Sequence, residues 1–157
     1  MQYPQILVYE TDGQLAAMLR ETAKIQRWAL REPRKAESCL RLLRSLCPSV
    51  VILKMGTYAK REAGLPLKEE EERRRAAGRE KEQIHSLDLL AKVHELFPDA
   101  ALVAVGDAED VGLGGLAWEY GASYVLVPPM SRQMLAEVVV GLMHEAIAKG
   151  KHDGVGR

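Results

Sequence analysis

Short apolar runs alternate along the chain with longer segments in which apolar residues recur every three or four positions. The runs lie at 6–9, 28–30, 50–53, 101–105 and 124–127. Continuous apolar runs are typical of strands buried on both faces of a parallel sheet, and the recurring positions are typical of helices that pack one side against it. Five repeats of strand and helix predict right-handed crossovers and a parallel sheet with helices on both faces.

The expected helices have recognisable ends. Asp12 is the expected N-cap of the first helix. Pro48 and Pro98 are expected to end the second and third, and Gly121 to end a glycine-rich fourth helix over 111–120. The last helix carries more apolar surface than one core needs. The expected inward-facing residues are Leu15, Met18, Leu19 and Thr22; Ala36, Leu40, Leu43 and Leu46; Leu87, Leu90, Val93, His94 and Phe97; and Leu135, Val138, Val139, Leu142 and Met143.

The length of 157 residues fits one domain, expected over 1–148, with a flexible, glycine- and charge-rich tail at 149–157. A charged insertion is expected at about 56–84. Within it, four glutamates at 69–72 precede three arginines at 73–75, so opposite charges lie at i,i+4 spacing and favour a solvated helix. The insertion has no apolar stripe, and it is either an excursion without a role or an arm that docks a protein partner.

Composition narrows the possible partners and the location. Lysine plus arginine equals aspartate plus glutamate at 22 each, so no net field favours nucleic acid or an anionic membrane. The sequence begins without the pattern of a secretory signal, and no apolar run is long enough to cross a bilayer. We therefore expect a cytoplasmic protein.

Cys39 and Cys47 lie two helical turns apart and are expected to be free, buried thiols.

Sites in parallel sheets form at the carboxyl ends of the strands. Four of the five expected strands are followed by Glu10, Lys54, Gly106 and Pro128, so these positions are the first candidates for a functional site.

Several segments together resemble the receiver domain of two-component response regulators. They are the strand with its acidic end (Ile6–Asp12), the strand that follows a proline (Pro48–Lys54), the next helix (Leu87–Pro98), and the Gly-Ala strand that ends in proline (Gly121–Pro129). This resemblance implies a CheY-like, flavodoxin-like α/β fold. Its three layers contain a doubly wound, five-stranded parallel sheet of strand order 2-1-3-4-5.

Receiver chemistry needs two acids that hold magnesium, an aspartate that accepts the phosphoryl group, and a hydroxyl and a lysine that contact the phosphoryl oxygens. Matched position by position, the resemblance implies a degenerate pocket in this chain. Lys54 stands at the acceptor position, where an ammonium cannot form an acyl phosphate and repels magnesium. The pocket comprises Glu10 at the first acid, Thr11 at the second with Asp12 beside it, Lys54, Gly106 at the hydroxyl with Asp107 after it, and Pro128 at the lysine.

Two alternatives remain for the Lys54 side chain. In the first, its ammonium forms a salt bridge with Glu10, and with Asp12 and Asp107, which fixes the surrounding loops in one state. In the second, the ammonium reaches solvent while the aliphatic stem stays against the protein.

Other motifs give no support for catalysis. The glycine-rich stretch at 106–115 matches neither a P-loop nor a dinucleotide-binding pattern. The histidines His85, His94, His144 and His152 have no metal-ligand spacing, and no serine lies in a nucleophile-elbow context. We therefore expect no enzyme activity, no catalytic residue, no metal and no cofactor.

The resemblance implies a partner surface on the fourth helix, fifth strand and fifth helix, where Trp118, Tyr120, Tyr124 and Leu142 lie. This surface is also the expected route to a homodimer. The sequence thus favours a phosphorylation-independent receiver-like module that signals or scaffolds through protein contacts, without nucleic acid or membrane. Two alternatives are a flavodoxin-like domain that binds a small molecule or anion through Lys54, and an atypical receiver still switched by a ligand.

Overall fold

Five parallel strands form one sheet in the computed structural model, which describes residues 4–10, 13–55, 73, 86–107, 112, 114–127 and 134–155. The strand order is β2-β1-β3-β4-β5, which confirms the predicted doubly wound α/β fold. The central strand β3 is buried at every position because it has a neighbour on each side and helices on both faces. The strands are β1 (Gln5–Tyr9), β2 (Ala29–Arg31), β3 (Val50–Lys54), β4 (Ala101–Val105) and β5 (Tyr124–Leu126).

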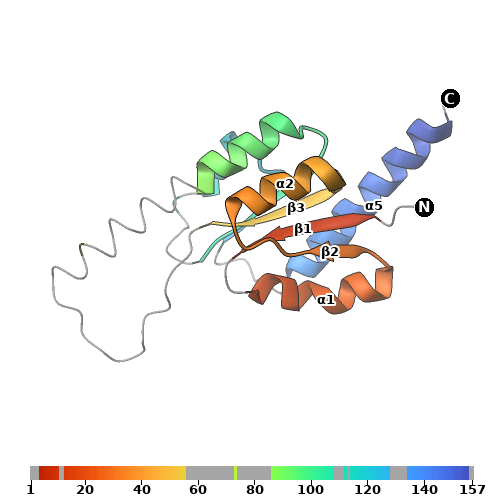
Figure 1. Ribbon diagram of the computed structural model, residues 1–157, viewed down its shortest axis with the longest axis horizontal. Helices are drawn as coiled ribbons and strands as arrows, with labels where there is room; N and C mark the ends of the chain where they lie inside the picture. Colours follow the sequence, from red (N-terminus) through yellow and green to blue (C-terminus); the bar gives the residue numbers. More distant parts are fainter. Residues whose placement is uncertain are drawn as a thin grey trace.

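Helices cover the two faces of the sheet in separate layers (Figure 1). One layer contains α1 (Gln14–Gln26) and α5 (Met134–Val155), and the other contains α2 (Ala36–Leu46), the helical residues 86–96 and α4 (Gly114–Glu119). The last turns of α5 project beyond the amino ends of the strands (Figure 1).

Alternation along the strands divides the core into two clusters. On β1 and β3, Ile6, Val8 and Ile52 pack with α1 and α5. Leu7 and Val51, one residue out of step, pack with α2 and the helical residues 86–96. Successive strand side chains point to opposite faces, and each fully buried aliphatic side chain contributes about 1.5–3 kcal/mol of burial free energy. The apolar runs of the sequence therefore supply both halves of the core.

The start of α1 differs from the prediction. The N-cap is Gly13, with φ 78° and no side-chain hydrogen bond, rather than Asp12. Asp12 itself lies outside the described residues. Gly13 tolerates the left-handed φ, and the free N–H groups of the first turn find their acceptor elsewhere, at Glu10.

Four smaller expectations are also corrected. The second strand begins at Ala29 rather than Trp28, because the Trp28 N–H donates to the Ala23 carbonyl in the turn after α1. Met18 and His94 were expected to face inward but are exposed. Cys47 was expected to be buried, yet it is exposed at the left-handed C-cap of α2.

Two predicted boundaries meet the structure in different ways. The described part of the fourth helix is α4, which is shorter than the predicted 111–120, and Gly121 follows it with a φ of 109° as a C-terminal glycine should. The last helix continues to Val155 through the stretch that was predicted to be a tail.

Apart from Arg73, the predicted charged insertion at 56–84 lies outside the described residues, so that interpretation stays a prediction.

Within the part of the chain that the structure describes, none of the helices combines the length and apolar character that a membrane crossing requires.

We predict that Gly121→Ala lowers the free energy of unfolding by about 2–4 kcal/mol, through an unfavourable φ and overpacking. A β-carbon at this position would lie 2.3 Å from His94 Cγ. Urea denaturation followed by circular dichroism measures the effect.

The control variant is Gly141→Ala, because a β-carbon there meets nothing within 4 Å in the middle of α5. It should raise stability by about 0.5–1 kcal/mol. The double variant His94→Ala/Gly121→Ala should recover only the part of the loss caused by the imidazole ring, because the β-carbon of residue 94 lies 2.8 Å away and remains. Equal stability of Gly121→Ala and the wild type would contradict this account.

Candidate functional site

Strand register places the candidate residues in one row at the carboxyl end of the sheet. Tyr9 pairs with Leu53, so the next residues, Glu10 and Lys54, stand level on adjacent strands. Lys54 in turn pairs with Val105 on β4. The expected juxtaposition of Glu10, Lys54 and the residues after β4 therefore follows from the sheet.

Glu10 is fully buried beneath the amino end of α1. Its two carboxylate oxygens accept hydrogen bonds from the backbone N–H groups of Leu15 and Ala16, each at 2.9 Å. These donors are among the N–H groups that a helix leaves unpaired at its start, and the positive end of the helix dipole stabilises the carboxylate. Glu10 therefore fixes β1 to α1 by charge-assisted hydrogen bonds.

Asp12 was the predicted N-cap because aspartate is common at that position. The carboxylate that accepts hydrogen bonds from the start of α1 instead belongs to Glu10, the residue directly after β1. A signal was present in the glycine directly before the helix, which supplies no side chain of its own, and in the acid three residues before it.

Lys54 lies on the same face of the sheet as Glu10. Ile52, two residues earlier, packs with α1 and α5, and the side-chain period of a strand is two. Lys54 exposes only 8% of its surface, so most of its side chain is buried, and the alternative in which the ammonium reaches solvent along its aliphatic stem stays a prediction. The predicted salt bridge to Glu10 stays a prediction, because the hydrogen bonds described for the Glu10 carboxylate come from the backbone.

Gly106 and Asp107 complete the described part of the predicted pocket. Gly106 is buried, and its N–H donates to the Leu126 carbonyl at 2.9 Å, which continues the sheet past β4. Asp107 is half-buried. Thr11, Asp12 and Pro128 lie outside the described residues, so their expected roles stay predictions.

Arg34 adds a cation to this rim that the sequence reasoning missed. A β-carbon on Gly13 would lie 2.7 Å from Arg34 Nη2, so the guanidinium lies directly against the glycine of the β1–α1 loop. Glu32 accepts from Arg20 at 2.9 Å and pairs with Arg34 at 3.5 Å. Arg34 follows Gly13 by 21 positions (34 − 13) and reaches this loop only through the fold, so the spacing of residues gave no signal.

The predicted partner residues occupy different environments. Trp118 on α4 is 51% exposed, and Tyr120, directly after the helix, is 42% exposed. The Trp118 ring contacts that of half-buried Tyr124, with centroids 6.3 Å apart. Leu142 is half-buried against the core, so it offers less surface than expected. Leu116, which the sequence did not single out, is 41% exposed on α4.

A buried thiol lies beside the end of β1. Burial raises the pKa of Cys39 to about 12. Burial also raises the pKa of Tyr9, and the neighbouring Cys39 adds to that rise. Both groups therefore stay neutral near pH 7, and Cys39 lacks the thiolate character of a reactive cysteine.

Comparison with known proteins relates this geometry to solved structures. No protein-family model matches the sequence, and no curated protein matches it. A response regulator from Thermotoga maritima has a TM-score of 0.66 at 15% identity, over 91% of this chain and 99% of that one. A CheY-like receiver domain protein from Methanospirillum hungatei has a TM-score of 0.64 at 14% identity, over 94% and 99%.

NtrX from Brucella abortus, solved in complex with ADP, has a TM-score of 0.66 at 15% identity; the match covers 98% of this chain and 29% of NtrX. At these identities the likeness concerns the fold. The chain has the fold of response-regulator receiver domains, as the resemblance in the sequence predicted.

A receiver fold implies magnesium at the strand ends, and the described residues do not fit that ion. Magnesium requires several oxygen ligands in near-octahedral geometry. Both Glu10 oxygens already accept backbone N–H groups, and the Lys54 ammonium belongs to the same face of the adjacent strand, where it repels a dication. Among the described residues, no three His, Cys, Asp or Glu side chains are grouped as a metal site.

We predict that Glu10→Gln lowers the free energy of unfolding by about 1–3 kcal/mol, because the amide loses the charge and turns an N–H group toward the α1 donors. The matched control, Glu21→Gln on the exposed side of the same helix, should change stability by less than about 0.5 kcal/mol. Chemical denaturation of both variants measures the difference. Equal effects would show that Glu10 does not act through the buried hydrogen bonds.

We also predict that only Cys47 reacts with Ellman's reagent in the native protein, because it is exposed whereas Cys39 is buried with a raised pKa. Cys39 should react once denaturant unfolds the chain. The variant Cys47→Ser serves as the control and should show no fast reaction. Rapid modification of this variant would contradict the burial of Cys39.

Proposed function

We propose that this chain is a phosphorylation-independent receiver-like module that acts in signalling or scaffolding through protein contacts and catalyses no reaction. The observation that carries the proposal is Lys54, a buried cation at the end of the central strand and level with the buried Glu10.

The chemistry at this position argues against phosphotransfer. An acyl phosphate forms on a carboxylate oxygen, and the Lys54 side chain has none. Gly106 also supplies no hydroxyl for the phosphoryl oxygens. Magnesium and lysine are the groups that stabilise charge during phosphoryl transfer, and the described donor set does not fit the metal.

The same residues suggest how the module keeps a single state. Glu10 ties the end of β1 to the start of α1 without a metal ion. Lys54 supplies a fixed positive charge on the neighbouring strand. We propose that these built-in groups replace the contacts that a ligand makes and breaks in a switchable domain, so that the strand-end loops hold one arrangement.

The exposed side chains of α4 are the proposed contact surface for a protein partner. Leu116 and Trp118 on this six-residue helix, and Tyr120 directly after it, each expose more than a third of their surface. Large exposed apolar and aromatic side chains are enriched at protein interfaces. The contact between Trp118 and Tyr124 extends this surface to β5, which is compatible with a partner of another sequence or with a homodimer through α4, β5 and α5.

An amide NMR titration tests the proposal directly. We predict that magnesium, followed by magnesium with beryllofluoride as a phosphoryl mimic, leaves the peaks of Glu10, Lys54 and Gly106 in place. A receiver of known phosphorylation, titrated under the same conditions, is the positive control. Saturable shifts at these residues that spread to α4 would overturn the proposal and identify an atypical receiver that a ligand still switches.

A further inference from the structure

Basic residues are concentrated along one edge of the sheet. Between residues 20 and 44 the chain has eight lysines and arginines and three glutamates, a local charge of +5 in a chain of zero net charge. All eight cations are exposed. We call them the basic band: Arg20, Lys24, Arg27, Arg31, Arg34, Lys35, Arg41 and Arg44.

The band surrounds the edge strand β2. This strand pairs with β1 on one side and ends the sheet on the other. The helix α1 lies on one face and α2 on the opposite face (Figure 1). Arg20 on α1 forms a salt bridge with Glu32, just after β2, so the side of α1 that carries Arg20 faces the edge of this strand. Arg20 from α1 and Arg34 from the segment after β2 therefore meet at this border, and β2 and the two flanking helices with their caps carry the other cations.

The other half of the molecule has the opposite charge. Across 86–107 and 114–127 the chain has five acidic residues and one basic residue, a local charge of −4. These residues belong to and surround β4 and β5, at the far side of the sheet. The expectation that a net charge of zero leaves no field is therefore incomplete, because the fold separates the charges.

The basic band already holds one carboxylate. Glu32 accepts from Arg20 at 2.9 Å and lies 3.5 Å from Arg34. Guanidinium groups match carboxylates in shape and hydrogen bonding, and six of the eight cations are arginines. The internal contact shows that guanidinium groups from α1 and from the segment after β2 come close enough to share a single carboxylate.

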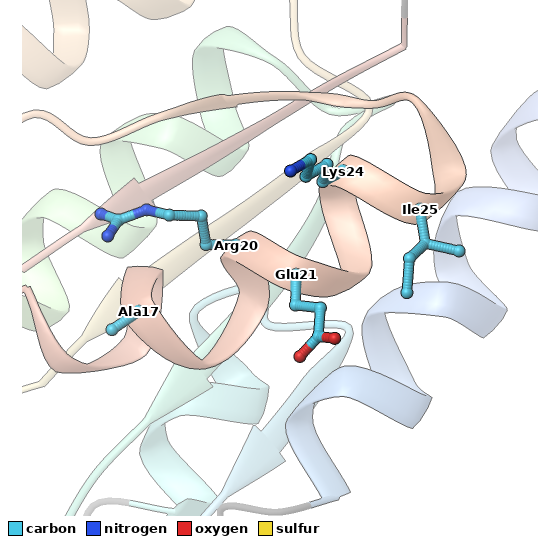
Figure 2. A pocket seen from close by; sticks show the side chains of 5 residues that line it. All are labelled: Ala17, Arg20, Glu21, Lys24 and Ile25. Atoms are coloured by element: carbon cyan, nitrogen blue, oxygen red, sulfur yellow. The ribbon is translucent and has the colours of Figure 1, made fainter.

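Aliphatic side chains lie among the cations in two shallow hollows. The first, on α1, is lined by Ala17, Arg20, Glu21, Lys24 and Ile25. Figure 2 shows Arg20 and Lys24 on one side of the helix and Glu21 and Ile25 on the other, and Ile25 is 71% exposed. The second hollow, on α2, is lined by Glu37, Leu40, Arg41, Arg44 and Ser45.

We propose that the basic band docks an acidic segment of a partner protein that also carries aliphatic side chains. The cations attract the carboxylates, and Ile25 and Leu40, which line the hollows on α1 and α2, provide apolar contacts. The assignment is independent of the proposed function, because it rests on the cations of α1, β2 and α2 and not on Glu10, Lys54 or Gly106.

Nucleic acid fits this surface less well. A phosphate backbone has no aliphatic side chain to place against Ile25. Stacking of unpaired bases needs exposed aromatic rings, and the aromatic ring within the described span 20–44, Trp28, is buried. The acidic half of the molecule also repels a long polyanion, whereas a short acidic segment stays within a Debye length of the cations.

Fluorescence anisotropy with defined probes tests the proposal on the whole chain. The first probe is a labelled peptide with glutamate and leucine at helical spacing. Two related peptides replace all glutamates by glutamine or all leucines by serine, and labelled single-stranded and duplex oligonucleotides test the other class of ligand. The glutamate–leucine peptide should bind more tightly than all the others, and its affinity should fall at least about tenfold between low and physiological salt.

Two charge-reversal variants separate the band from net charge. Lys24→Glu/Arg41→Glu alters the band, and Lys92→Glu/Lys149→Glu changes the net charge equally at exposed positions elsewhere. The first should weaken binding of the glutamate–leucine peptide by at least about tenfold, and the second by less than about threefold. Amide peak shifts in the wild-type protein should map to α1, β2 and α2, which locates the site even if a variant folds poorly.

The other outcomes each overturn the assignment. Equal loss in both variants would mean attraction to net charge alone. Tighter binding of an oligonucleotide than of the peptide would assign the band to nucleic acid. An absence of peptide binding at low salt would mean that the band is a solvated surface.

Discussion

Two-sided burial of β3 is the constraint on which the rest of the structure depends. The strand has a parallel neighbour on each side and a helical layer on each face, so all of its positions are shielded from water. Its backbone groups must be paired within the sheet, which fixes the register with β1 and β4. That register carries Lys54 to the end of the sheet and sets it level with Glu10, although a lysine is among the residues least often buried.

Backbone groups of the protein itself stabilise the buried carboxylate of Glu10 at the strand ends. The Glu10 carboxylate is satisfied by the first free amides of α1, an interaction that needs neither metal nor ligand. Burying a charge is costly unless it is hydrogen-bonded or paired, so removal of either buried group should disturb the loops around it. Under the proposed function, these contacts favour one arrangement of the strand-end loops.

Sheet order also decides how charge is distributed over the surface. The chain visits β2 early and β4 and β5 late, and the order 2-1-3-4-5 sends these parts to opposite edges. Basic residues that are close in sequence therefore stay together at one border, and acidic residues gather at the other. The α4 surface and the basic band lie in separate parts of the sheet, so the two proposed contact regions are distinct.

The sequence by itself determined the architecture, because continuous apolar runs such as Val50–Leu53 can be satisfied only by burial on both faces. It also placed Lys54 and Gly106 at strand ends, since strand ends are local features. Only the tertiary structure decided that Glu10 rather than Asp12 provides the acceptor for the start of α1, and that Arg34 lies against Gly13. Those contacts depend on how a loop closes and on which segments meet across the sheet, and neither spacing nor composition encodes these distances. The tertiary structure also decided that Cys47 is exposed and that charge is separated within a neutral chain. Both depend on which segments pack beside a residue and not on the residue type.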